Sequence, residues 1–140
     1  MKKSVRVFVH SAQQYDDYAD QITTNSVGEY TATKNVHTII YCEKMEGDNL
    51  VNNTLTLKKD GAVLDRTGAV TSRMVFDSGK TTDAEYITAY GDMAFRINTT
   101  RYDARIEEEH INVLLQYDLI HDCQKVSKNI LQISIEIQQP

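Results

Sequence analysis

The chain has 140 residues, a formal net charge of -5, and 41% hydrophobic and 25% charged residues. These values are typical of one soluble globular domain, residues 1–140, and argue against a disordered chain or a membrane protein. The 15 basic residues are scattered and outnumbered by 20 acidic ones, which argues against a nucleic-acid partner because phosphate binding relies on clustered Lys and Arg.

Short segments in which apolar and polar residues alternate, divided by turn residues, run along the whole chain. Alternation with period two predicts β-strands, because successive side chains of a strand point to opposite faces. The predicted strands are residues 4–10, about 22–33, 36–44, 50–59, 62–67, 70–76, about 82–90, 93–102, 110–120 and 130–137. Residues 13–21 and 103–109 favour at most one helical turn each, and neither is long enough to form a major helix.

Turn residues separate these segments. Asp60-Gly61 is a strong signal for a two-residue hairpin turn, and residues 77–80 predict a second hairpin. Gly68 indicates a bulge or a sharp bend. The clearest alternation is near the C-terminus, where apolar residues occupy the odd positions from 111 to 119 and from 131 to 137.

Many consecutive hairpins create sheet edges that must be hidden from other chains. A long antiparallel meander hides its edges best by closing on itself. The sequence therefore predicts an all-β fold, a closed antiparallel up-and-down β-barrel of about 8–10 strands. A barrel of about eight strands is either filled by side chains or holds one small ligand.

Several motifs follow one another in a specific order: Arg66-Thr67-Gly68, then Phe76, then Tyr86-Ile87-Thr88-Ala89-Tyr90-Gly91. Tyr41-x-Glu43 precedes them and Tyr117-Asp118-Leu119 follows. In these motifs the chain resembles the DUF1934 family, the YwiB-like proteins of Firmicutes. The resemblance implies a closed β-barrel of the calycin or lipocalin-like type in a small bacterial cytoplasmic protein. It carries over no catalytic residue, because the function of the family is unknown, and Ala89 stands where the family usually has proline.

Side chains expected inside the barrel form the candidate site. Apolar neighbours on the same strand face place Arg66 inside. A buried guanidinium is costly unless a carboxylate or several acceptors surround it, and Glu43 is the best candidate partner. The same alternation directs four further candidates inward: Phe76, Tyr86, Thr88 and Tyr90.

Two interpretations of this interior stay open. In the first, Arg66 binds the anionic group of a small molecule, and Phe76, Tyr86 and Tyr90 flank its apolar part. In the second, the barrel is plugged, and Arg66 bonds to Glu43 and to backbone carbonyls as a structural link. Buried ion pairs often have that structural role.

Other motifs predict no activity. Gly79-Lys80-Thr81-Thr82 lacks the first glycine of a phosphate-binding loop and lies between two strands. The sequence His121-Asp122-Cys123 is read as a polar turn, because neighbours in a strand do not face one another and no nucleophile elbow is present. The histidines lack metal-ligand spacing, so neither a metal nor a cofactor is expected.

Cys42 and Cys123 are too few for a disulfide framework, and we expect them to be reduced and packed as small hydrophobic side chains.

The sequence also gives an expectation for location. No apolar run approaches the roughly 20 residues that span a bilayer. Arg6 and His10 interrupt the segment that would follow the N-terminal lysines in a signal peptide. A cytoplasmic location with no membrane partner is therefore expected by elimination.

Three functions follow from these observations. The residues favour a non-enzymatic module that binds one amphipathic or anionic small molecule. The alternative is a structural or protein-interaction barrel with a plugged interior, whose outer surface binds a partner. An enzyme is the least favoured, and it would use Glu43 with Tyr86 or Arg66 for acid–base chemistry. The sequence sets no oligomeric state.

Overall fold

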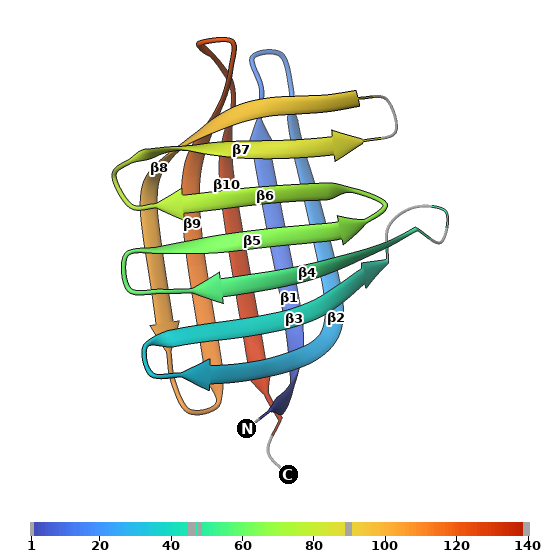
Figure 1. The fold of residues 1–140 in the computed structure, drawn as a ribbon, viewed down its shortest axis with the longest axis vertical. Coiled ribbons are helices and arrows are strands. Elements are labelled where there is room, and N and C mark those ends of the chain that lie inside the picture. The colour runs from blue at the N-terminus through green and yellow to red at the C-terminus, as the bar shows by residue number, and fades with distance from the viewer. Residues whose placement is uncertain (1, 45–46, 48, 89–90, 139–140) are drawn as a thin grey trace.

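The computed structural model describes residues 2–44, 47, 49–88 and 91–138. Ten antiparallel strands contain most of them (Figure 1). The strands are β1 Lys3–Gln14, β2 Ala19–Thr33, β3 Val36–Lys44, β4 Leu50–Leu57, β5 Gly61–Gly68, β6 Thr71–Asp77, β7 Thr81–Thr88, β8 Gly91–Ile106, β9 His110–His121 and β10 Gln124–Ile137. In this part of the chain, no helix is long and apolar enough to cross a membrane.

The strands form a closed up-and-down barrel. Each strand pairs with the next one along the chain, and β1 closes the barrel by pairing with β10, where Val7 lies opposite Ile135. The start of β1 and the end of β10 lie side by side (Figure 1), and the Gln138 N–H donates to the carbonyl of Ser4 at 2.8 Å. Closure gives each described strand a neighbour on both sides, which satisfies the backbone hydrogen bonds of an edge. The predicted all-β barrel is confirmed, and it fits a calycin-like architecture.

Two long strands, β2 and β8, form the corners of the barrel. Figure 1 shows β3 to β7 crossing in front of β1, β9 and β10, while β2 and β8 bend and follow both groups. In β8 the register shifts between Thr99 and Arg101, near the point where pairing passes from β7 to β9, and such a bulge bends a strand. In β2, Gly28 pairs with both neighbours, and a Cβ there would lie 2.3 Å from the carbonyl oxygen of Ile40. Only glycine permits this approach.

The predicted strands are present, and several are longer than the sequence pattern indicates. The helical turns expected in residues 13–21 and 103–109 are absent from these described segments, because β1 reaches Gln14, β2 starts at Ala19 and β8 continues to Ile106. Pairing with neighbouring strands supplies their backbone hydrogen bonds and outweighs a weak local preference for helix. Gly68 ends β5 with a φ of 113°, which agrees with the predicted bend.

The expectation for the cysteines was wrong in one respect. Both thiols are free, but both are exposed instead of packed inside. Cys42 lies between the buried residues Tyr41 and Glu43, and alternation therefore directs its side chain outward. Cys123 lies in the turn between β9 and β10 and has a φ of 63°. Local position, not side-chain hydrophobicity, decides their exposure.

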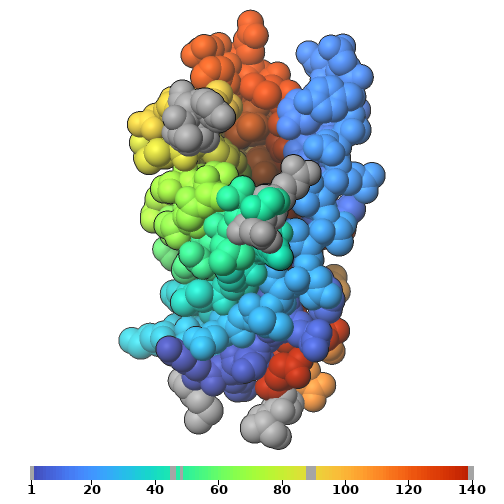
Figure 2. Space-filling view, turned by 90° about the vertical axis from the view of Figure 1, so that its right-hand side faces the viewer, coloured from blue at the N-terminus to red at the C-terminus, as the bar shows by residue number. Residues whose placement is uncertain are grey.

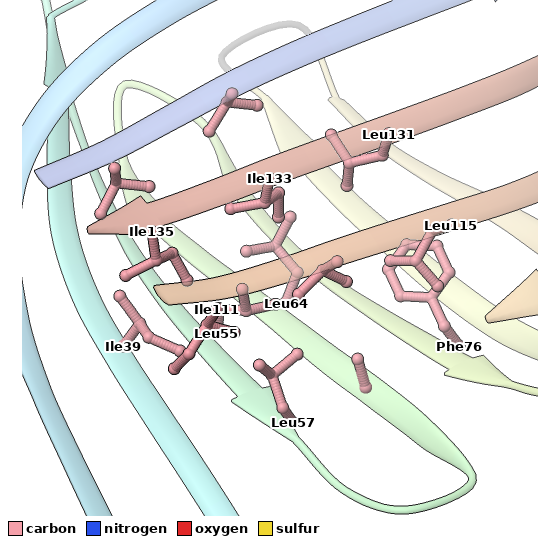
Figure 3. Packing of buried hydrophobic residues seen from close by; sticks show 14 of the residues in the cluster. Ile39, Leu55, Leu57, Leu64, Phe76, Ile111, Leu115, Leu131, Ile133 and Ile135 are labelled. Atoms are coloured by element: carbon pink, nitrogen blue, oxygen red, sulfur yellow. The ribbon is translucent and has the colours of Figure 1, made fainter. Parts of the chain in front are cut away.

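Apolar side chains fill one part of the interior. The inward series of β9 and β10 are buried as predicted, from Ile111 to Tyr117 and from Leu131 to Ile137. Figure 3 shows side chains of these strands meeting Ile39, Leu55 and Leu57 from β3 and β4. The interior also contains buried polar side chains, so it is not apolar throughout. These residues are Ser26, Glu43, Asn53, Ser72, Thr99, Ser127 and Asn129.

Truncation of an inward side chain should destabilise the barrel far more than truncation of an outward one. Leu55 has 0% exposure, and Leu55→Ala should lower the free energy of unfolding by about 2–5 kcal/mol, through lost burial and the cavity left behind. Ile40 on the adjacent strand is 51% exposed, and Ile40→Ala should change this free energy by about 0.5 kcal/mol or less. Urea unfolding followed by circular dichroism measures both, and equal losses would contradict the assignment of strand faces.

Candidate functional site

A cavity of about 170 Å³ lies inside the barrel, next to the buried polar side chains of β3 and β4. Figure 2 shows the molecule hollowed between the blue strands β1 and β2 and the green and yellow strands that face them. The apolar part of the lining consists of Val9, Ile22, Leu64, Met74 and Leu131. The polar part includes Thr24, Tyr41, Glu43, Asn53, Arg66, Tyr86 and Tyr117.

Arg66 reaches this cavity from the second half of β5. Its neighbours across the sheet are Asn53 on β4 and Ser72 on β6. The Arg66 Nε donates to Asn53 Oδ1 at 3.0 Å, and Nη2 lies 3.4 Å from Glu43 Oε1. The side chain is 21% exposed, so the guanidinium is mostly removed from water. These contacts use one edge of a group that carries five N–H donors.

Glu43 is the centre of a hydrogen-bond network that connects four strands. It projects inward from β3, and its side chain is 8% exposed. Thr24 of β2 donates to Glu43 Oε2 at 2.6 Å, and Asn53 Nδ2 of β4 donates to Glu43 Oε1 at 2.9 Å. With Arg66 of β5, three donors surround this carboxylate. A buried carboxylate needs such partners to offset the loss of its hydration.

Three tyrosines present their phenols to the same cavity. Burial raises the pKa of Tyr86, although the positive charge of Arg66 acts to lower it. Burial also raises the pKa of Tyr41 and of Tyr117, and Arg66 again acts in the opposite direction on both. The three phenols are therefore protonated at neutral pH and act as hydrogen-bond donors. Tyr86 in this state is not a base that could take a proton from a substrate.

Ser72 carries a buried hydroxyl that lies outside the cavity lining. It lies between Arg66 and Tyr86 in the register of β5, β6 and β7, and it is 5% exposed. Its Oγ has no hydrogen-bond partner among the described residues, and the same holds for Thr99 Oγ1. A buried hydroxyl without a partner is unusual and costs free energy.

The structure brings three of the six predicted site residues together at the cavity. Arg66, Glu43 and Tyr86 line the cavity, and the predicted contact between Arg66 and Glu43 is present. Phe76 does point inward but is 1% exposed, and it packs edge-on against Tyr117 with ring centroids 4.9 Å apart, outside the lining. The side chain of Thr88 and the whole of Tyr90 lie outside the described residues.

Among the polar residues of the lining, the sequence analysis missed Thr24, Tyr41, Asn53 and Tyr117 as site residues. The sequence could have indicated Asn53 as a buried polar residue, because it shares the inward face of β4 with Leu55 and Leu57. An amide in an apolar series needs a partner, and here that partner is the ion pair.

The described residues contain no group of three or more His, Cys, Asp or Glu side chains arranged to hold a metal ion. The polar lining of the cavity combines one carboxylate with amide, hydroxyl and guanidinium donors. Cations need several oxygen, nitrogen or sulfur ligands. This arrangement suits an anion instead.

Comparison with known proteins supports the fold. A family model described as "Domain of unknown function (DUF1934)" matches residues 7–133. A search of curated proteins finds no match. Among solved structures, the ywiB protein from Bacillus subtilis is similar, with a TM-score of 0.87 and 20% sequence identity over 99% of this chain and 94% of that one. At this identity the likeness concerns the fold alone.

Removing the charge of Glu43 should weaken the fold. Glu43→Gln keeps the size of the side chain but leaves the Arg66 guanidinium without a counter-charge, and we expect a loss of about 1–3 kcal/mol in unfolding free energy. Asp65→Asn is the matched control, because Asp65 pairs with Arg73 at 3.0 Å on the outer surface, where such pairs contribute about 0–1 kcal/mol. Urea unfolding compares the two variants, and a larger loss in Asp65→Asn would contradict this interpretation.

Alkaline pH should destabilise the barrel. Burial raises the pKa of Tyr102 to about 12 and also raises that of Tyr41 and Tyr117. Tyrosines of the unfolded chain lose their protons near pH 10 or so. The folded barrel holds these protons more tightly than the unfolded chain, so this contribution to stability is fully present below that pH. It is lost as the pH rises from about 10 toward 12. Unfolding measured across this range should show the decline, with a shallower slope in Tyr102→Phe. A pH-independent free energy would contradict the assignment.

Proposed function

This chain belongs to the DUF1934 family of unknown function, and we propose that its barrel binds one small organic anion, held by Arg66 in the internal cavity. The observation that carries the proposal is the state of Arg66. Its guanidinium is mostly buried, yet its contact with Glu43 is 3.4 Å long. A guanidinium of this kind has hydrogen-bond donors left to bind a carboxylate.

The neighbouring groups support an anionic ligand because nearly all of them are donors. Tyr41 and Tyr117 are protonated phenols, and the hydroxyl of Tyr86 donates to Met74 Sδ at 3.3 Å. The acceptor oxygens of Glu43 already receive hydrogen bonds. A ligand that brings acceptor oxygens therefore complements the site, and a carboxylate fits best.

Cavity size limits the ligand. The volume of about 170 Å³ is below the roughly 300–1,000 Å³ of pockets for drug-sized molecules. It is similar to an engineered cavity of about 150 Å³ that holds benzene. Val9, Leu64, Met74 and Leu131 form an apolar wall for the body of such a molecule. The proposed ligand is accordingly a carboxylate with a compact apolar body of about one ring.

A structural role is the second candidate, and a specific observation favours it. The Arg66, Asn53, Glu43 and Thr24 contacts connect β2 to β5, as a plugged barrel would require. In that case the outer surface would carry any interaction with a partner. Removal of Arg66 would then lower the free energy of unfolding of the barrel without changing its affinity for a small molecule.

We also propose a cytoplasmic location for this protein, on the sequence grounds given above.

Titration with benzoate tests the proposal. Benzoate should bind with one saturable site, and Arg66→Gln should weaken binding by about 10- to 100-fold, as expected for a lost charge-assisted hydrogen bond of about 1.5–3 kcal/mol. Arg73→Gln is the control, because Arg73 pairs with Asp65 on the outer surface; it should leave the affinity unchanged. Uncharged benzyl alcohol should bind much more weakly than benzoate.

Calorimetry or ligand-observed NMR measures these affinities. Equal benzoate affinity in Arg66→Gln and the unmodified protein would contradict the proposal. The proposal would also be wrong if no small monocarboxylate binds to the unmodified protein in a saturable way.

A further inference from the structure

We infer that the ligand is an aromatic monocarboxylate, with its ring against Tyr86 and Tyr117 and its carboxylate on Arg66. This inference rests on the proposed function and narrows the substrate class. Aliphatic side chains in the lining contact an aromatic or a saturated ring about equally. Selection between the two must therefore come from the tyrosine rings and from Met74.

The ring of Tyr86 is held in place from two sides. Phe95 packs edge-on against it, with ring centroids 5.3 Å apart and an interplanar angle of 83°. Its hydroxyl donates to Met74 Sδ at 3.3 Å. A ring fixed before binding loses little entropy when a ligand packs against it.

The ring of Tyr117 is fixed in a similar way on another strand. Phe76 packs against it at 4.9 Å with an interplanar angle of 62°, and Phe76 is itself almost fully buried. The cavity is thus lined by two preorganised aromatic rings that come from β7 and β9. Aromatic pairs in edge-on or offset geometry gain free energy beyond the burial of area.

Met74 and the position of Arg66 add to this selection. Met74 lines the cavity with its thioether, and sulfur makes favourable contacts with the edges of aromatic rings. Strand β6, with Ser72, lies between β5 and β7, so the backbones of Arg66 and Tyr86 are about 10 Å apart. Both residues line the cavity. A ligand with a carboxylate attached directly to a ring can contact both groups at once.

A further aromatic pair lies at the turn between β1 and β2. Tyr15 stacks on Tyr18 with ring centroids 4.6 Å apart and an interplanar angle of 19°. Neither ring belongs to the cavity lining, so the selection for an aromatic ligand rests on Tyr86 and Tyr117.

The test compares benzoate with cyclohexanecarboxylate, which has the same charge and a similar size but no aromatic ring. The unmodified protein should bind benzoate about 2- to 10-fold more tightly, which corresponds to the usual gain from one aromatic contact. In Tyr86→Leu this ratio should fall at least twofold. Tyr86→Phe, the matched control, keeps the ring but not the hydroxyl and should retain the ratio.

Proton NMR of the unmodified protein provides a second measurement that needs no variant. Bound benzoate should receive saturation transfer from the tyrosine ring protons and shift upfield through their ring currents. Equal affinity for the two acids, or an unchanged ratio in a folded Tyr86→Leu, overturns this inference alone. Failure of both acids to bind in an Arg66-dependent manner overturns the proposed function itself.

Discussion

Closure of the sheet is the constraint on which the rest of the molecule depends. Because β1 pairs with β10, every second side chain of each strand must fit into one enclosed space. An arginine or a glutamate at an inward position then has no easy route to bulk water. Arg66 and Glu43 occupy such positions, and the network through Asn53 and Thr24 follows from the need to satisfy both charges.

The interior is divided between two kinds of packing. Inward leucine and isoleucine side chains of β3, β4, β9 and β10 are buried and fill one part (Figure 3). The other part contains the ion pair and three phenols around a small cavity. Apolar packing stabilises the fold, and the polar part carries the groups on which the proposed ligand binding depends.

The same polar part shows why stability and binding are difficult to separate in this barrel. Arg66 links β5 to β3 and β4, and it is also the only arginine in the lining of this cavity among the described residues. A buried ion pair is weak evidence for a stabilising role by itself, since desolvation offsets much of its attraction. The proposed binding depends instead on the N–H donors of Arg66 that its contacts with Asn53 and Glu43 do not use.

The sequence by itself determined the up-and-down strand order and the inward faces, because period-two alternation is a local signal that is readable in one chain. The cost of a buried charge made Glu43 the candidate partner of Arg66, and the structure shows this contact at 3.4 Å. It did not determine the strand ends: weak helix preference in residues 13–21 and 103–109 was overruled by pairing with neighbouring strands. Only the tertiary structure placed Tyr117, Asn53 and Ser72 around Arg66, since the curvature of the closed sheet sets which inward side chains meet across the interior. The size of the cavity was likewise decided there, because it depends on how side chains from opposite walls pack.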